Sequence, residues 1–331
     1  MNLFEKVLFK ALLKILSVWQ RKPLRPPTAR ECKLIEELRA ILKDFSRITQ
    51  STPNATSEAK KVWSEHADEL LDLLKTKDPR TFLRWDVITK TMFVGNGYYI
   101  QKELTYLKKH QHWKDQWMKG IEESQIGCPS PFVFFPKSSG NLIHHAYHLS
   151  QFEDKTGEKI SDCDMVFEFG GGYGSLCRLF YQVGFKGKYV IFDLPPLSAL
   201  QVFYLKLLEL DAELEPLMNS APHKISCLYN LQDVEKFILK WNVHKNLKSV
   251  FIATWSISEI PLNERQRIFN WVTPFNFFLI SYQHRFGEVN NHDFFTELTK
   301  KMNHIQWLNW GIDHLPGNYY LIGKKKEKKD L

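Results

Sequence analysis

Residues 165–174 read MVFEFGGGYG, a short apolar run followed by four glycines. The apolar run has the length of a buried strand, and residues 175–183 after the glycines show a helical pattern. Because glycine has no Cβ, the backbone between the two can turn tightly and a ligand can press against it. The free N–H groups at the start of the following helix suit an anionic group such as a carboxylate. The stretch therefore predicts a strand, a ligand-binding turn and a helix in succession.

Strands and helices alternate from here to the end of the chain. Further strands are expected at 188–193, 224–230, 249–255 and 277–283, and the helices between them at 196–210, 234–241 and 264–272. Two last strands, at 304–310 and 319–325, flank a Pro-Gly-Asn turn. Such alternation predicts an α/β fold with a doubly wound sheet. We expect a Rossmann-like, mostly parallel seven-stranded sheet with a C-terminal antiparallel hairpin, preceded by a helical N-terminal region.

Pattern and charge divide the chain into four parts. We expect a basic amphipathic helix and linker at 1–30, a helical cap or substrate region at 31–150, the ligand-binding domain at 151–323 and a Lys-rich tail at 324–331. The formal net charge is +8; the first and last of these parts carry +6 and +3, which leaves −1 for the residues between them. Nucleic-acid binding needs a basic face on the folded domain, so we expect no nucleic-acid partner.

The N-terminal helix expected over 3–19 places Lys6, Lys10 and Lys14 on one face. It is too short and too charged to span a bilayer, so it either lies on an anionic membrane surface or packs on the protein. Five cysteines without a C-x-x-C pair indicate a reducing compartment. We expect a cytoplasmic protein, located at the inner face of the membrane if residues 3–19 bind lipid.

Two acids flank the glycine turn. Glu168 ends the first strand, and Asp193 ends the second strand, 19 residues after Gly174. A carboxylate at Asp193 can accept hydrogen bonds from both ribose hydroxyls of an adenosine, and Glu168 can lie near an ammonium group. A dinucleotide turn would need a third glycine where Ser175 or Cys177 stands. The pattern favours S-adenosylmethionine over a dinucleotide or a tight turn without a ligand.

The predicted cofactor-binding residues lie in the turn and at the ends of the strands. They are Glu168, Gly170, Gly171, Gly172, Gly174, Asp193, Leu194, Asn230 and Thr254. Asn230 and Asp233 are the polar residues expected near the adenine.

The sugar O-methyltransferase family, found near bacterial surface-polysaccharide genes, closely resembles this chain at 168–201, EFGGGYGSLCRLFYQVGFKGKYVIFDLPPLSALQ. Residues 138–149, 251–261 and 314–323 resemble its flanking motifs, so the similarity covers about residues 80–323. The resemblance implies the class I S-adenosylmethionine-dependent methyltransferase fold. It also implies O-methylation of a sugar or glycan intermediate in polysaccharide biosynthesis.

Two other functions remain open at this point. The chain could methylate a nitrogen or a protein, although the classes that do so often carry Asn/Asp-Pro-Pro-Tyr after the fourth strand, where this chain has ATWSISEIP. It could also be a non-catalytic module that binds S-adenosylmethionine, although the intact Glu168, glycines and Asp193 speak against that.

A sugar hydroxyl is a poor nucleophile, so a general base should assist the transfer. Glu259 follows the fourth strand and His284 follows the fifth, where both can reach the crevice. His145 lies on the helix before the first strand, as do His144 and His148, which share a face. A metal could bind His144 and His148, but no third ligand is evident, so we predict no metal site.

Four aromatic residues are candidates for stacking on a sugar ring or for the core. They are Trp255, Tyr282, Trp307 and Trp310. We expect residues 31–150 to form a helical cap, because an enzyme for a small acceptor needs walls that exclude water.

Overall fold

The computed structural model describes residues 24–49, 58–214, 225–241 and 247–327. The expected helix over 3–19 and the end of the Lys-rich tail at 328–331 lie outside these residues. In the part of the chain that is described, no helix is both long and apolar enough to cross a bilayer.

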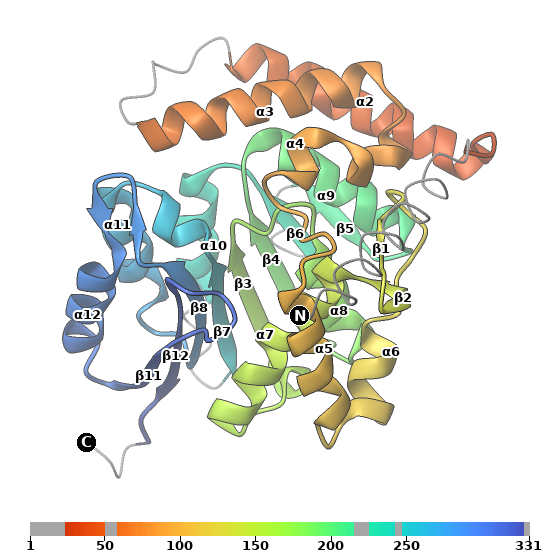
Figure 1. Cartoon of the computed structure of the whole chain (residues 1–331). Coiled ribbons are helices and arrows are strands. Elements are labelled where there is room, and N and C mark those ends of the chain that lie inside the picture. The colour runs from red at the N-terminus through yellow and green to blue at the C-terminus, as the bar shows by residue number, and fades with distance from the viewer. Residues whose placement is uncertain (1–23, 50–57, 215–224, 242–246, 328–331) are drawn as a thin grey trace.

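A central sheet of eight strands organises the described residues, in the order β11-β12-β8-β7-β3-β4-β6-β5 (Figure 1). Its strands are β3 (Met165–Phe169), β4 (Lys188–Phe192), β5 (Ala212–Leu214), β6 (Ile225–Leu228), β7 (Ser249–Thr254), β8 (Phe277–Gln283), β11 (Ile305–Gly311) and β12 (Asn318–Lys325). All neighbours from β8 to β5 are parallel, whereas β12 is antiparallel to both β8 and β11. The Rossmann-like class I methyltransferase fold predicted from the sequence is therefore confirmed.

The central sheet has eight strands where the sequence predicts seven, and the strand that was not predicted is β5. β5 pairs with β6 at the edge of the sheet over only three residues. A run this short cannot show the alternation or the apolar length by which a strand is recognised in a sequence. The other seven strands are those expected, with ends that differ by one or two residues.

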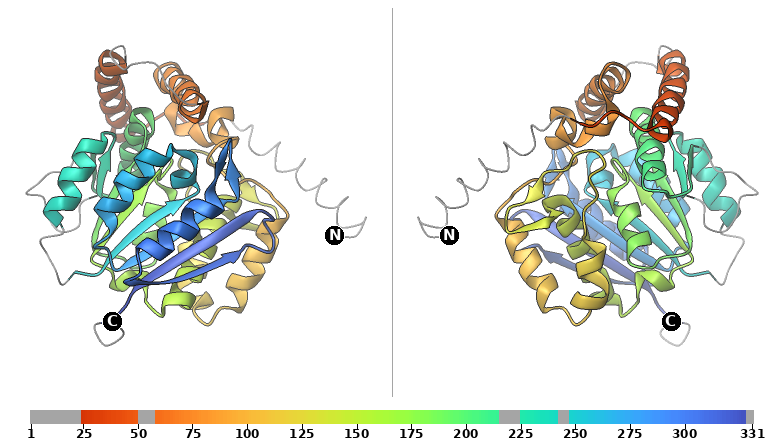
Figure 2. Two further views of the ribbon diagram at one scale, coloured as in Figure 1. Left: turned by 90° about the vertical axis from the view of Figure 1, so that its left-hand side faces the viewer. Right: turned by 90° about the vertical axis from the view of Figure 1, so that its right-hand side faces the viewer.

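Helices cover both faces of the sheet, and Figure 2 looks onto each helical layer in turn. One layer holds α7 (Gly140–Thr156), α8 (Ser175–Gln182) and α9 (Pro195–Leu207); the other holds α10 (Leu231–Trp241), α11 (Leu262–Val272) and α12 (Asn291–Lys301). Along β7, Val250 and Ile252 join the first apolar core, and Phe251 and Ala253 join the second. Burial on both faces explains why the strands read as continuous apolar runs.

The N-terminal region adds helices at two places. Its elements are α2 (Ala29–Thr49), α3 (Glu58–Thr76), α4 (Asp86–Thr89), α5 (Tyr99–Lys109), α6 (Met118–Gly120), β1 (Pro131–Phe132) and β2 (Phe135–Ser139). Of these, α2, α3 and α4 lie above the sheet, and α5 and α6 pack on α7 and α8 (Figure 1). A small hairpin of β9 (Arg285–Phe286) and β10 (Val289–Asn290) lies beyond β8. The helices α2 and α3 cross above the sheet (Figure 1).

Two contacts show that α2 and α3 lie over the carboxyl ends of the strands. The Phe45 ring of α2 packs edge-on against Tyr229, just after β6, with ring centroids 4.7 Å apart. Trp63 of α3 donates a hydrogen bond to Glu259, which follows β7. The expected boundary at 150/151 falls inside α7, which runs unbroken across it. Residues from Leu34 to Ile322 share one apolar core, so these helices are packed onto the sheet as part of the same body.

Candidate active site

The glycine turn is clamped against the loop that follows β7. Gly170 has φ +75°, a conformation that strains any residue with a Cβ, and a Cβ there would collide with the side chain of Ser256. The Ser256 hydroxyl donates a hydrogen bond to the Phe169 carbonyl, and the Gly170 N–H donates to the Phe192 carbonyl at 2.7 Å. Three strand ends therefore meet at this turn.

Gly172 is held from two directions. Its N–H donates to Oδ2 of Asp193 at 2.7 Å, and its carbonyl accepts from Nε2 of Gln201 on α9 at 2.8 Å. Its φ is +55°, and the nearest atoms to a Cβ built there belong to Met92, 3.6 Å away. The Cα of Gly172 thus faces the segment after α4.

Asp193 at the end of β4 has the donor and acceptor balance of a ribose-binding carboxylate. Oδ1 accepts from the Leu194 N–H at 2.7 Å and Oδ2 from the Gly172 N–H, which leaves lone pairs on both oxygens. Burial raises the pKa of Asp193 to about 7, although the two N–H groups oppose the rise. Two ribose hydroxyls would supply the missing hydrogen bonds to the ionised form.

Glu168 at the end of β3 is a second buried carboxylate. Oε2 accepts a hydrogen bond from the Tyr189 hydroxyl at 2.9 Å. Burial raises the pKa of Glu168 to about 8, the Tyr189 hydrogen bond lowers it, and the charge of Asp193 raises it further. A cation such as the ammonium of an amino acid would favour the ionised form of Glu168.

The other predicted cofactor residues surround this pair of acids. Gly171 lies so close to Glu168 that a Cβ would come within 2.8 Å of its carboxylate, and Gly174, with φ +91°, caps α8. Thr254 ends β7 beside the turn. Asn230 uses its Oδ1 to accept from the Gln232 N–H at the start of α10. Asp233 pairs with Lys236 on the same helix.

Trp255 directly follows β7 in a strained conformation. Its φ of +63° is rare for a bulky residue and is kept only where the surroundings impose it. The Trp255 N–H donates to the Ser281 carbonyl, and Nε1 donates to Oδ1 of Asn318, both at 2.7 Å. The indole stacks on the His144 imidazole with ring centroids 5.5 Å apart and planes 24° apart.

His144 shares a buried carboxylate with a second histidine. Its Nδ1 lies 2.8 Å from Oε1 of Glu103 on α5, and Nε2 of His314, in the turn between β11 and β12, lies 2.8 Å from the same oxygen. Glu103 is fully buried. Burial alone would raise the pKa of Glu103, but the two histidines outweigh it and lower the pKa.

The neighbouring histidines of α7 have different surroundings. Nδ1 of His145 is buried without a partner among the described residues, and burial lowers the pKa of His145 to about 3. His148 is hydrogen-bonded through Nδ1 to the Tyr320 hydroxyl, and its Nε2 is sealed without a described partner. Burial lowers the pKa of His148 far below its ordinary value.

Glu259 and His284 take different places. Glu259 accepts from Nε2 of Gln283 at 3.3 Å and lies beneath α3, and burial raises the pKa of Glu259 to about 7. His284 is exposed and stacks on His292 with ring centroids 5.5 Å apart. Glu259 therefore stays within the loop after β7, whereas His284 belongs to a surface group of rings.

The four aromatic candidates also separate. Tyr282 stacks on Tyr319, 5.3 Å between centroids, and Trp307 packs on Phe278 in the second core. Trp310 packs on Tyr320. Trp255 is the member of the group that adjoins the glycine turn, through Ser256.

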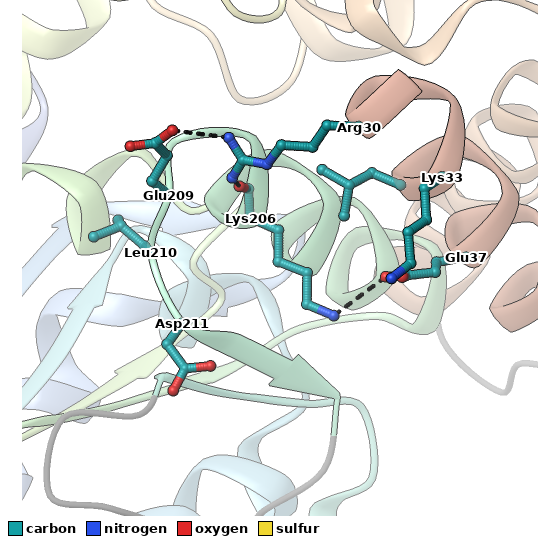
Figure 3. Close-up of a pocket in the computed structure, with 8 residues that line it drawn as sticks. Arg30, Lys33, Glu37, Lys206, Glu209, Leu210 and Asp211 are labelled. Atoms are coloured by element: carbon teal, nitrogen blue, oxygen red, sulfur yellow. Dashed lines mark hydrogen bonds and ion pairs between the residues drawn. The ribbon is translucent and has the colours of Figure 1, made fainter. Parts of the chain in front are cut away.

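A hollow of about 390 Å³ lies between α2 and the end of α9 (Figure 3). Four of its charged residues form ion pairs: Arg30 pairs with Glu209 at 2.9 Å, and Lys206 with Glu37 at 3.4 Å. None of the predicted site residues lines it. Within the described ranges, no three His, Cys, Asp or Glu side chains are grouped as metal ligands.

Comparisons with known proteins show no family for this chain. No model of a known protein family matches the chain, and no curated protein matches it. Among solved structures, the methyltransferase domain of a bacterial Hen1 (CtHen1-C) is 11% identical, with 56% of this chain and 97% of that chain covered at a TM-score of 0.39. The Methanococcus jannaschii fibrillarin pre-rRNA processing protein is 11% identical, with coverages of 51% and 69% and a TM-score of 0.37.

The 16S rRNA methylase ArmA is 14% identical, with 70% of this chain and 99% of that chain covered, at a TM-score of 0.33. All three TM-scores are below 0.5, so the assignment rests on the strand order and the glycine turn of this chain. The chain has the class I methyltransferase fold, and in it Gly170–Gly174 and Asp193 lie at the carboxyl ends of β3 and β4.

Proposed function

We propose that the chain is an S-adenosylmethionine-dependent O-methyltransferase that methylates a hydroxyl of a sugar or glycan intermediate. The observation that carries the proposal is the pairing of Asp193 with the glycine turn, in which one carboxylate oxygen takes the Gly172 N–H and both oxygens keep lone pairs. S-adenosylmethionine supplies a methyl group on a cationic sulfur, which a nucleophilic oxygen can attack directly.

The residues of the turn would bind and orient that cofactor. Asp193 would accept the ribose hydroxyls, the N–H groups at the start of α8 would face the carboxylate, and Glu168 would face the ammonium. The cap helices α2 and α3 would exclude water from the carboxyl ends of the strands, and their contacts with Tyr229 and Glu259 support this role. Positioning of the two reactants then supplies much of the rate.

The sugar acceptor is supported by the resemblance of residues 80–323 to sugar O-methyltransferases. An RNA acceptor is disfavoured by the net charge of −1 over residues 31–323.

Titration calorimetry tests the cofactor. We expect wild type to bind S-adenosylmethionine and Asp193→Ala to bind it at least about tenfold more weakly, because two hydrogen bonds to an ionised group are lost. Asp293→Ala is the matched control, since this exposed aspartate lies on α12, away from the glycine turn, where Asn290 donates a hydrogen bond to it. Absence of binding to wild type would sink the proposed function.

Transfer of a tritium-labelled methyl group tests the acceptor. The panel should contain nucleotide sugars, methyl glycosides, total RNA and a mixture of peptides. We expect label in the sugar fractions alone. Label in RNA or peptides would show that the acceptor is not a sugar hydroxyl. The chain would still be a methyltransferase.

A further inference from the structure

We propose that His144 is the general base of the methyl transfer and that Glu103 and His314 position its imidazole. The inference rests on the proposed function and adds the identity of the group that takes the proton. It is carried by the stacking of His144 on Trp255, which follows β7, and by its contact with a fully buried carboxylate.

The first turn of α7 connects the cofactor turn to this imidazole. Asn141 donates from Nδ2 to the Tyr173 hydroxyl, at 2.8 Å, and Tyr173 belongs to the glycine turn. His144 follows Asn141 by three residues, less than one helical turn, which advances about 5.4 Å. Its ring stacks on Trp255, whose neighbour Ser256 closes the glycine turn from the other side. His144 therefore lies near the carboxyl ends of β3 and β7, on the side where α5 presents Glu103.

The hydrogen bonds of His144 leave one nitrogen for chemistry. Nδ1 lies within 2.9 Å of both oxygens of Glu103, so a neutral ring donates its proton there and carries its lone pair on Nε2. No described residue forms a hydrogen bond with Nε2 of His144. Surrounding atoms enclose Nε2 of His148 and Nδ1 of His145, but they do not enclose this nitrogen. Of the three histidines on α7, His144 is the one with an open acceptor nitrogen and a fixed tautomer.

Burial of the Glu103 carboxylate is unfavourable by itself, and two histidines compensate for it. A fully buried carboxylate costs several kcal/mol unless it is paired and hydrogen-bonded. Here it is held by histidines from two distant parts of the chain, with Tyr99 packed edge-on against His144 and stacked on His314. When the His144 ring gains a proton, the charge of Glu103 stabilises the imidazolium, which is the role of the third group in a nucleophile–base–acid arrangement.

The step balances as a direct displacement. The acceptor oxygen forms a bond to the methyl carbon as the carbon–sulfur bond breaks, and the bonding electron pair remains on sulfur. The hydroxyl proton passes to Nε2 of His144, and release of that proton to water restores the base. No oxidant, reductant or metal enters the balance.

The tautomer of His144 gives a test that needs no acceptor. Long-range ¹⁵N–¹H spectra of histidine-labelled protein, assigned by loss of the signals in His144→Gln, should show Nδ1 protonated and Nε2 free in the neutral ring. In Glu103→Leu the fixed tautomer should be lost. A ring protonated on Nε2 in wild type, or one unaffected by Glu103→Leu, would overturn the proposal.

Turnover with the hydroxyl acceptor found in the panel tests the chemistry. His144→Ala should lower kcat about 10²- to 10⁴-fold, and added imidazole should restore part of it. Calorimetry should show S-adenosylmethionine binding within about threefold of wild type, so that failure of the base is distinguishable from failure of the cofactor assignment. His112→Ala, a half-exposed histidine of the same region paired with Asp115, is the control.

Glu103→Gln and His314→Asn should lower kcat less than His144→Ala does and should not respond to imidazole, because the base itself is present. Wild-type kcat in His144→Ala, or a loss of kcat that imidazole leaves unchanged, would show that the cluster serves the fold alone.

Discussion

Burial sets the charge of the two carboxylates that end β3 and β4. Asp193 receives two backbone N–H groups and Glu168 one hydroxyl, yet burial raises both pKa values, to about 7 and about 8. Near neutral pH these groups sit close to their midpoints, so a ligand that needs the ionised form is bound with a change in protonation.

Affinity for S-adenosylmethionine should consequently rise with pH. Below about pH 7 Asp193 is mostly protonated, and its proton must leave before both oxygens accept ribose hydroxyls. Between about pH 6 and pH 8 the Kd should fall about tenfold from this residue alone. Calorimetry at several pH values checks the trend. Asp193→Asn should lose this share of the dependence, and an unchanged slope in the variant would assign the effect to another group.

The choice among His144, His145 and His148 belongs to the same scale. The sequence places all three on one helix, and we named His145 together with Glu259 and His284 as candidate bases. The structure favours His144 because α5 presents Glu103 to it. Periodicity predicts which residues share a helix face, but it does not predict what the facing helix carries there.

At the scale of elements, the glycine turn owes its shape to positive φ and to the loop it touches. Gly170 and Gly157 have similar values, +75° and +69°, but a Cβ at Gly157 would meet nothing within 4 Å, whereas one at Gly170 would strike Ser256. A substitution at Gly157 therefore measures the conformational strain alone, whereas one at Gly170 measures the strain together with the steric clash.

Alanine at each position should show this separation. Gly157→Ala should lower the free energy of unfolding by about 1–3 kcal/mol, the cost of a left-handed conformation, and leave cofactor binding unchanged. Gly170→Ala should lower it further and weaken S-adenosylmethionine binding, because Ser256 must move. Urea unfolding and calorimetry measure both. Equal effects of the two substitutions would contradict the role of Ser256 in closing the turn.

At the scale of the whole molecule, the cap and the sheet form one body. Phe45 contacts Tyr229 beyond β6, Trp63 contacts Glu259 beyond β7, and Met92 faces Gly172. All three contacts reach the carboxyl ends of parallel strands, where this architecture binds its ligand. Binding of a ligand at the glycine turn should therefore change the dynamics of the cap.

Hydrogen exchange provides the measurement. Binding of S-adenosylhomocysteine should slow amide exchange in residues 89–97, which include Met92 opposite Gly172, and in α3 above the loop after β7. The helix α12, on the opposite layer, should show no change and serves as the internal control. Equal protection of α12 and the cap would indicate general stabilisation by mass action in place of a local contact.

Much of the fold was predictable because its signals are local. The apolar runs of the strands, the glycines at 170–174 and the acid at Asp193 are read from neighbouring positions, since backbone turning and burial on both faces act on successive residues. The strand β5 was not predicted because three residues are too few to show the apolar pattern of a strand.

The arrangement around the candidate base was decided by tertiary structure alone. Glu103 stands 41 positions before His144 and 211 before His314, and no spacing in the chain relates them. They meet because α5 packs on α7 and the β11–β12 hairpin ends beside both. The strain of Trp255 and the raised pKa values of Asp193 and Glu168 have the same origin, since burial is a property of the packed molecule. The sequence by itself determined the fold and the glycine turn. Packing of distant segments determined which side chains lie beside that turn.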